Sequence, residues 1–89
     1  MHTTMDYIND VRNFVTSNFL FGAPDSFQND ASFLESGIID SMGILELITF
    51  VEKTYGVKVE PEEMVPENFD SVSKLALFVS KKVAKSVPA

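Results

Sequence analysis

The chain of 89 residues contains no cysteine and a single histidine, His2, near its N-terminus. Without cysteine there is no disulfide, no thiolate nucleophile and no cysteine-based metal site. With the only imidazole at the edge of the chain, no histidine is placed to activate a serine nucleophile. The composition therefore disfavours an enzyme, and we expect no catalytic residue. The acids at positions 60–70 are spaced like a solvated edge and lack the pattern of a calcium loop, so we expect no bound metal either.

Residues 13–52 contain no lysine or arginine but six acids, in a chain whose formal net charge is −6. Such a stretch repels phosphate backbones and anionic lipid, which disfavours binding to nucleic acid or to a membrane. It attracts a basic patch on a protein partner instead. The acids are Asp25, Asp30, Glu35, Asp40, Glu46 and Glu52.

The chain also lacks a signal peptide and an apolar run of membrane-spanning length, so we expect a cytoplasmic protein. Its length accommodates one core, which 45% hydrophobic residues and eight phenylalanines are sufficient to close. We expect a monomer with a single domain over residues 1–89, ordered from about residue 4 to 85.

Apolar residues recur at helical spacing in three segments, which predicts an all-α fold. We expect a small four-helix bundle, with three main helices, one short helix and a long first loop. The first helix is predicted over about residues 4–20, and the second over residues 41–55 with Gly56 as its stop. The core faces of the three helices are Ile8, Val11, Val15 and Phe19; Ile44, Leu47, Ile48, Val51 and Tyr55; and Val72, Leu75, Ala76, Val79 and Val83.

The long loop ends the first helix at residues 21–25 and needs anchors on the core. Its expected anchors are Phe27, Phe33 and Leu34. A short helical turn is predicted at residues 30–34, and a tight turn at Ser36-Gly37.

Pro61 and Pro66 each stand where a short helical turn can begin, and one of the two, the second in preference, is expected to form the short helix. Asp70 and Ser71 are predicted to cap the last helix. Lys81, Lys82 and Lys85 suit the negative end of its dipole. Residues 87–89 are expected to be disordered.

Ser41 is the candidate functional residue, because it begins the most apolar helix after a glycine turn and two aliphatic residues. Helical geometry leaves Met42, and Leu45 in part, in solvent beside it. Taken alone, Asp40-Ser41 is an ordinary helix cap. A helical interaction module in which Ser41 is unmodified therefore remains one hypothesis.

The sequence resembles carrier proteins of the acyl, peptidyl and D-alanyl carrier superfamily over nearly its whole length. The residues that carry the resemblance are Phe33-Leu34-Glu35-Ser36-Gly37-Ile38-Ile39-Asp40-Ser41-Met42, then Leu45-Glu46-Leu47, and then Val51-Glu52-Lys53-Thr54-Tyr55-Gly56-Val57. The resemblance implies that Ser41 carries 4′-phosphopantetheine, transferred from coenzyme A by a phosphopantetheinyl transferase with Mg²⁺. It also implies that Asp40 helps the transferase to recognise the site.

By the same resemblance, the arm holds acyl cargo as a thioester for an acyl- or aminoacyl-activating ligase and a downstream acyltransferase or synthase. The implied partner surface is the second helix, with Met42, Leu45, Glu46, Thr49 and Glu52. A phosphodiester on Ser41 would also lie at the positive end of the helix dipole, near free backbone N–H groups.

Two residues depart from the pattern of fatty-acid carriers. Gly43 stands where those carriers have an acid, and Lys53 reverses a charge further along. Residues 36–43 are closer to D-alanyl and stand-alone aminoacyl or peptidyl carriers. Two carrier hypotheses follow: a discrete acyl carrier protein, or a D-alanyl, aminoacyl or peptidyl carrier that an adenylating ligase loads.

Overall fold

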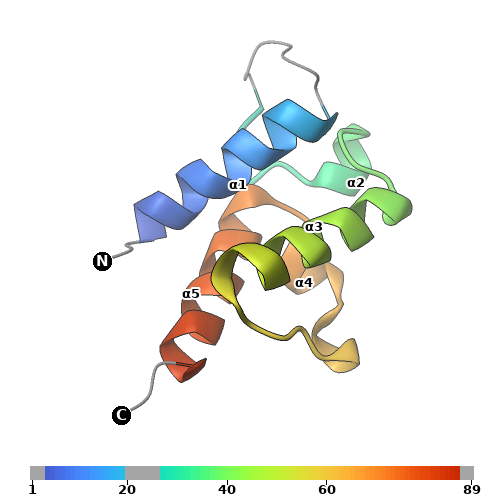
Figure 1. Cartoon of the computed structure of the whole chain (residues 1–89). Helices are drawn as coiled ribbons and strands as arrows, with labels where there is room; N and C mark the ends of the chain where they lie inside the picture. The colour runs from blue at the N-terminus through green and yellow to red at the C-terminus, as the bar shows by residue number, and fades with distance from the viewer. Residues whose placement is uncertain (1–3, 20–26, 87–89) are drawn as a thin grey trace.

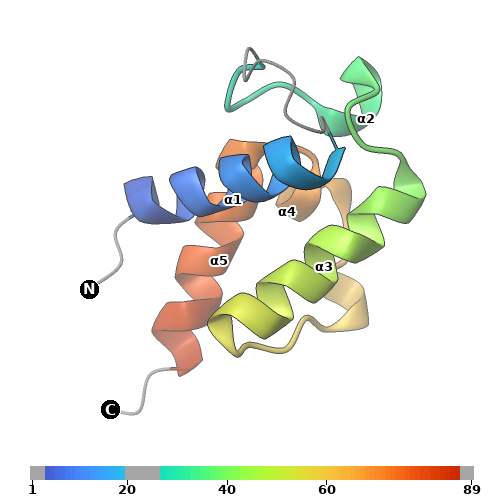
Figure 2. The same ribbon diagram turned by 45° about the horizontal axis from the view of Figure 1, so that its top comes forward.

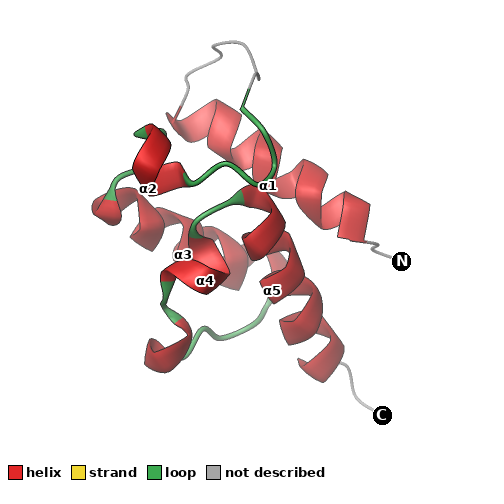
Figure 3. Cartoon of the chain, turned by 180° about the vertical axis from the view of Figure 1, so that it is seen from behind, coloured by secondary structure: helices red, strands yellow, loops and turns green. Residues whose placement is uncertain are grey.

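The computed structural model describes residues 4–19 and 27–86, and all regular structure in these ranges is helical (Figure 1, Figure 3). The elements are α1 (Thr4–Phe19), α2 (Phe33–Ser36), α3 (Ser41–Tyr55), the 3₁₀ turn η1 (Pro61–Glu63), α4 (Pro66–Phe69) and α5 (Val72–Ser86). The predicted all-α fold and the predicted bounds of the second helix are confirmed. The predicted loop start at 21–25 and the tail at 87–89 lie outside the described residues.

The core lies between α1, α3 and α5, with α1 crossing the first half of α5 (Figure 2). The predicted inner faces supply most of the residues of this core. Each fully buried aliphatic side chain contributes about 1.5–3 kcal/mol to the free energy of folding. Five predicted core residues are only partly buried at its edge: Ile8, Phe19, Ile44, Tyr55 and Val83. The completely buried members on these helices are Val11, Val15, Leu47, Val51, Val72, Leu75, Ala76 and Val79.

Aromatic rings connect α1 to α3. Phe14 stacks on Phe50 with the ring centroids 4.3 Å apart, and Tyr7 meets Tyr55 edge to face at 5.5 Å. The Tyr55 hydroxyl also donates a hydrogen bond to Asp10 Oδ2 at 2.8 Å. Burial, and then this hydrogen bond, raises the pKa of Tyr55, so the hydroxyl keeps its proton and the contact persists at neutral pH.

Arg12 on α1 holds the first described part of the long loop. Its guanidinium donates to Asn29 Oδ1 at 2.6 Å and to the Phe27 carbonyl at 2.9 Å. It also lies 4.2 Å from the centroid of the Phe27 ring. The backbone N–H of Ser73 donates to the Asn29 carbonyl at 2.8 Å. The loop is therefore pinned to both α1 and α5, with Phe27 as one anchor, as predicted.

The helical turn predicted at residues 30–34 lies slightly further along the chain, at α2. Ser32 caps this helix, and its hydroxyl donates to the Asp70 carboxylate. The other Asp70 oxygen accepts from the Leu34 N–H at 3.0 Å. Phe33 is fully buried, as predicted, but the Leu34 side chain is 42% exposed. Leu34 was wrongly predicted as an anchor, because a helix that begins at Phe33 turns the next side chain outward.

Two glycines in the left-handed conformation end helices, one at α2 and one at α3. Gly37, with φ 76°, ends α2 and turns the chain towards α3, and Gly56, with φ 66°, ends α3. Residues with a Cβ are strained at such positive φ. The predicted tight turn at Ser36-Gly37 and the predicted stop at Gly56 are therefore confirmed.

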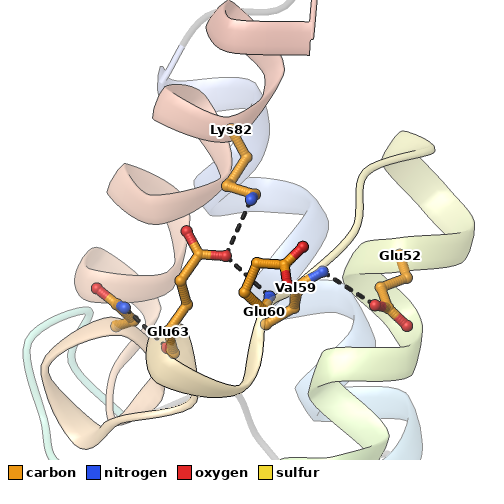
Figure 4. A network of polar contacts seen from close by, with 6 residues as sticks. Glu52, Val59, Glu60, Glu63 and Lys82 are labelled. Atoms are coloured by element: carbon orange, nitrogen blue, oxygen red, sulfur yellow. Dashed lines mark hydrogen bonds and ion pairs between the residues drawn. The ribbon is translucent and has the colours of Figure 1, made fainter.

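Both prolines begin helical turns, Pro61 in η1 and Pro66 in α4, where one short helix was expected. Glu63 connects η1 to α5 (Figure 4). Its Oε1 accepts from the Glu60 N–H and pairs with Lys82 Nζ, each at 2.9 Å. These contacts, the backbone one first, lower the pKa of Glu63. Lys82 thus has a specific ion-pair partner that its place near a helix end did not predict.

Ser71 caps α5, because its Oγ accepts from the Lys74 N–H at 3.1 Å. This half of the predicted Asp70-Ser71 cap is confirmed. The other half is wrong, since the Asp70 carboxylate turns away from α5 and supports α2.

Candidate functional site

Ser41 is the first residue of α3 and is exposed to solvent. Asp40 is the N-cap, and its Oδ1 accepts from the Gly43 N–H at 2.8 Å. The Asp40 carbonyl accepts the first hydrogen bond of the helix, from Ile44 at 3.2 Å. Asp40 and Ser41, the pair predicted from the sequence, thus lie together at the start of α3. Asp40 is the cap and Ser41 is exposed.

Backbone N–H groups make this helix start electropositive. Ser41 and Met42 are the first two residues of α3, so their N–H groups have no acceptor within the helix. The helix dipole adds partial positive charge at the same end. An anionic group attached to Ser41 is therefore stabilised by the backbone itself.

Gly43 lets the first turn of α3 approach its neighbours closely. A Cβ at this position would lie 2.5 Å from Ile39 Cγ2 and 2.8 Å from Phe19 Cε1. Gly43 therefore has a steric role. The sequence comparison with fatty-acid carriers, which have an acid at this place, indicated only a difference in charge. The signal in the sequence was a glycine inside a helix, a choice that costs about 1 kcal/mol relative to alanine and so needs a reason.

An apolar cleft of about 150 Å³ opens beside Ser41, between the start of α3 and α4. Leu34 and Met64 lie at this cleft and are each 42% exposed. Sequence reasoning missed both, because the cleft exists only once α2, α3 and α4 are placed together. Its lining residues are Leu34, Ser41, Ile44, Met64, Val65, Pro66, Phe69 and Asp70.

Four of the five predicted partner-surface residues lie exposed on the outer side of α3. Met42 is 72% exposed and Leu45 is 54% exposed. Glu46 is exposed, and so is Thr49, whose Oγ1 donates to the Leu45 carbonyl at 3.1 Å. An apolar pair next to a carboxylate is thus available to a partner.

Glu52, the fifth residue, is half-buried and turned toward the segment after α3. Its Oε2 accepts from the Val59 N–H at 3.0 Å (Figure 4). This carboxylate therefore holds the extended segment that follows the helix, a role that its position on the helix did not reveal.

Neither a membrane span nor a metal cluster is found in the described ranges. None of the helices there is long and apolar enough to cross a membrane. Across residues 4–19 and 27–86, no group of three histidine or acidic side chains converges as metal ligands would.

The fold and the site define a small helical domain that presents an exposed serine at a helix start beside an apolar cleft. Residues 20–79 match the family described as "Phosphopantetheine attachment site". The chain belongs to this family: it is a carrier protein with covalently attached 4′-phosphopantetheine. The site fits the group, because the exposed hydroxyl can take a phosphodiester and the cleft can take apolar atoms. Once attached, the arm supplies a thiol for a thioester.

Three carrier proteins are similar in sequence to this chain over most of its length. A D-alanyl carrier protein from Streptococcus pyogenes (serotype M5) is 32% identical over 62 residues, which are 70% of this chain and 78% of that protein. One from Abiotrophia defectiva is 29% identical over 55 residues, 62% and 70% of the two chains. The probable acyl carrier protein PigG from Serratia sp. is 28% identical over 69 residues, 78% and 79% of the two chains.

A solved structure described as "Crystal structure of FAD-dependent dehydrogenase" contains a chain with the same fold. The TM-score is 0.68 and the sequence identity 33%. The match covers 78% of this chain and 97% of the other, so the matched chain is about 70 residues long.

Proposed function

We propose that Ser41 carries the phosphopantetheine arm and that Asp40 and the first turn of α3 form the surface a phosphopantetheinyl transferase recognises. The supporting observation is the position of Ser41, exposed at the helix start and next to the cleft. Ser71 also stands at the start of a long helix, but it is 1% exposed. A transferase therefore has access to the first serine and not to the second.

In this proposal the protein is not itself an enzyme. The arm presents its cargo as a thioester to a loading ligase and then to an acyltransferase or synthase. The exposed face of Met42, Leu45, Glu46 and Thr49 receives these partners, while Glu52 holds the segment that follows the helix. We further propose that the carrier acts as a monomer in the cytoplasm, where coenzyme A supplies the arm.

We also propose that the cargo is a small acyl or aminoacyl group. A dry cavity of about 150 Å³ holds a molecule the size of benzene, and the cleft beside Ser41 has about this volume. A long fatty-acyl chain exceeds it. The similarity to D-alanyl carriers favours an adenylating ligase as the loading enzyme. Loading of the holo-protein with long-chain fatty acids in preference to every amino acid tested would contradict this proposal.

The dehydrogenase structure favours one class of downstream partner. A chain of about 70 residues is too short for a flavin enzyme, so that crystal holds a carrier-sized chain as well. We propose that an FAD-dependent dehydrogenase oxidises the thioester-bound cargo. Two hydrogens would leave adjacent cargo atoms and reduce FAD to FADH₂. Bleaching of the flavin on addition of the loaded carrier, but not of the unloaded carrier, is the expected result.

The attachment site is tested by incubating the apo-protein with a broad-specificity transferase, coenzyme A and Mg²⁺. The intact mass of the wild type should rise by one phosphopantetheine group. Cleavage after Glu35 and Glu46 releases residues 36–46, whose serines are Ser36 and Ser41. The mass increase should lie in this fragment, persist in Ser36→Ala and be absent in Ser41→Ala. Modification of Ser41→Ala would overturn the assignment.

A further inference from the structure

The last helix, α5, carries most of the positive charge of the protein. Residues 71–89 contain four of the seven lysine and arginine residues and no acid, whereas all 13 acids lie earlier in the chain. The solvent-facing side of α5 therefore differs in sign from the chain as a whole, whose formal net charge is −6. The four lysines are Lys74, Lys81, Lys82 and Lys85.

The helix dipole and the ion pair of α5 account for only two of these lysines. Lys85 lies in the last turn, where the dipole favours a cation, and Lys82 pairs with Glu63. Lys74 lies in the first turn of α5, where the dipole disfavours a cation, and Lys81 precedes the last turn. In the described part of the chain, no acid forms an ion pair with either Lys74 or Lys81. These two cations therefore need another explanation.

An exposed leucine lies between the same two lysines. Leu77 follows Lys74 by three residues and precedes Lys81 by four, and it is 51% exposed. Residues at this spacing share one side of a helix, and Lys85 continues the row by one more turn. A single exposed leucine is common on protein surfaces, but here cations flank it on both sides. We call Lys74, Leu77, Lys81 and Lys85, which are all exposed, the α5 basic face.

The α5 basic face lies apart from the proposed attachment residue. The residues that line the cleft beside Ser41 all precede α5 in the chain. The start of α3 and the C-terminal half of α5 lie on opposite sides of the molecule (Figure 1, Figure 3). A protein bound to the α5 basic face therefore leaves Ser41 and the cleft accessible to other enzymes.

We propose that the α5 basic face docks an acidic helix of a partner protein, which holds the carrier while Ser41 stays accessible. Lys74 and Lys81 are seven residues, or about 10 Å, apart along α5. This spacing matches two carboxylates on one side of a facing helix, with an apolar residue between them to cover Leu77. The surface goes beyond the proposed function, which assigns partners to α3 alone. Its charge is opposite to that of the acidic stretch, so it selects a different class of partner.

An anionic membrane is a poorer occupant of the α5 basic face. A helix that lies on a membrane inserts its apolar side, and the apolar side of α5 is buried in the core of this protein. The net charge of −6 also opposes the approach of an extended anionic surface, whereas a single helix meets only the lysines.

The test titrates the isotope-labelled full-length protein with a synthetic helical peptide of about 20 residues, followed by two-dimensional NMR. A central leucine of the peptide is flanked by glutamates three residues before it and four residues after it. The wild type should bind with a Kd of about 10–100 μM, more weakly at high salt. The amide shifts that change should belong to α5 and not to α3.

Three variants locate the contact. Leu77→Gln should raise the Kd for the peptide about tenfold. Lys81→Glu should raise it about threefold to tenfold. The matched control is Lys53→Glu, which changes the net charge equally at an exposed position of α3 and should bind within about twofold of the wild type.

Equal weakening by Lys81→Glu and Lys53→Glu overturns the proposal, because the peptide then responds to net charge alone. Equal affinity for a peptide of the same composition in scrambled order overturns it as well. Binding of the wild type to phosphatidylglycerol vesicles but not to the peptide, with loss of binding in Lys81→Glu, identifies a membrane as the occupant instead. A wild-type dimer in sedimentation that Lys81→Glu dissociates identifies a second copy of the chain.

The accessibility of Ser41 is tested with the wild type saturated by the peptide. Its intact mass should rise by one phosphopantetheine group at a rate within about twofold of the peptide-free protein. Loss of the mass increase only in the presence of the peptide overturns the proposal that Ser41 stays accessible. Failure of the peptide-free protein to gain an arm contradicts the proposed function instead, since the peptide titration does not involve the arm.

Discussion

Two Asp-Ser pairs stand at the starts of α3 and α5, each of 15 residues, and the two pairs have opposite roles. At α3, Asp40 caps the helix and Ser41 is exposed as its first residue. At α5, Ser71 caps the helix and is 1% exposed, while Asp70 turns back to α2. The helix starts one residue later in the second pair, and Ser71 lies among core residues such as Phe69 and Val72, whereas Asp40, the cap of α3, is exposed. The two serines therefore differ in exposure although each follows an aspartate at a helix start.

The largest expected effect comes from Gly43, two residues after the first pair. Gly43→Val places branched carbons against Ile39 and Phe19, where even a Cβ would lie within 3 Å. We expect the free energy of unfolding to fall by about 3 kcal/mol, at the upper end of the usual cost of overpacking. Urea unfolding followed by circular dichroism measures it. A wild-type midpoint would show that the first turn of α3 does not depend on this close contact.

Much of this arrangement was predictable from local sequence. Asp40 and Gly56 mark the ends of α3, and the spacing of Leu47 and Val51 marks its buried face. Local signals suffice here because caps, stops and helical faces depend on neighbours within one or two turns.

Most of the contacts that escaped prediction join distant parts of the chain. Asp70 lies 36 residues from Leu34, whose N–H it accepts, and Lys82 lies 19 residues from Glu63. The steric need for Gly43 likewise depends on Phe19, at the end of another helix. Such partners are determined by how the helices pack, which the local pattern does not contain.

The second prediction compares the two acids. Asp70→Ala removes a carboxylate that accepts from both Ser32 and Leu34, so it should cost about 2 kcal/mol. Asp40→Ala removes a single capping bond to Gly43 and should cost about 1 kcal/mol. Chemical denaturation of both variants gives the difference. A greater loss for Asp40→Ala would reverse the structural roles assigned to the two residues.

The smallest effect comes from the two serines. Ser71→Ala removes the α5 cap and should lower the free energy of unfolding by about 1 kcal/mol. Ser41→Ala changes an exposed first-turn residue and should stay within about 0.5 kcal/mol of the wild type. Thermal melts of the two apo-proteins provide the comparison. Equal destabilisation by both substitutions would mean that Ser41 has a structural role as well.

Intact-mass analysis of these same two variants tests the central claim most directly. After incubation with transferase, coenzyme A and Mg²⁺, Ser71→Ala should gain one phosphopantetheine group as the wild type does, although it is the less stable protein. Ser41→Ala should gain none while remaining fully folded. A mass gain in Ser41→Ala, or its loss only in Ser71→Ala, would contradict the assignment of the exposed serine at the start of α3.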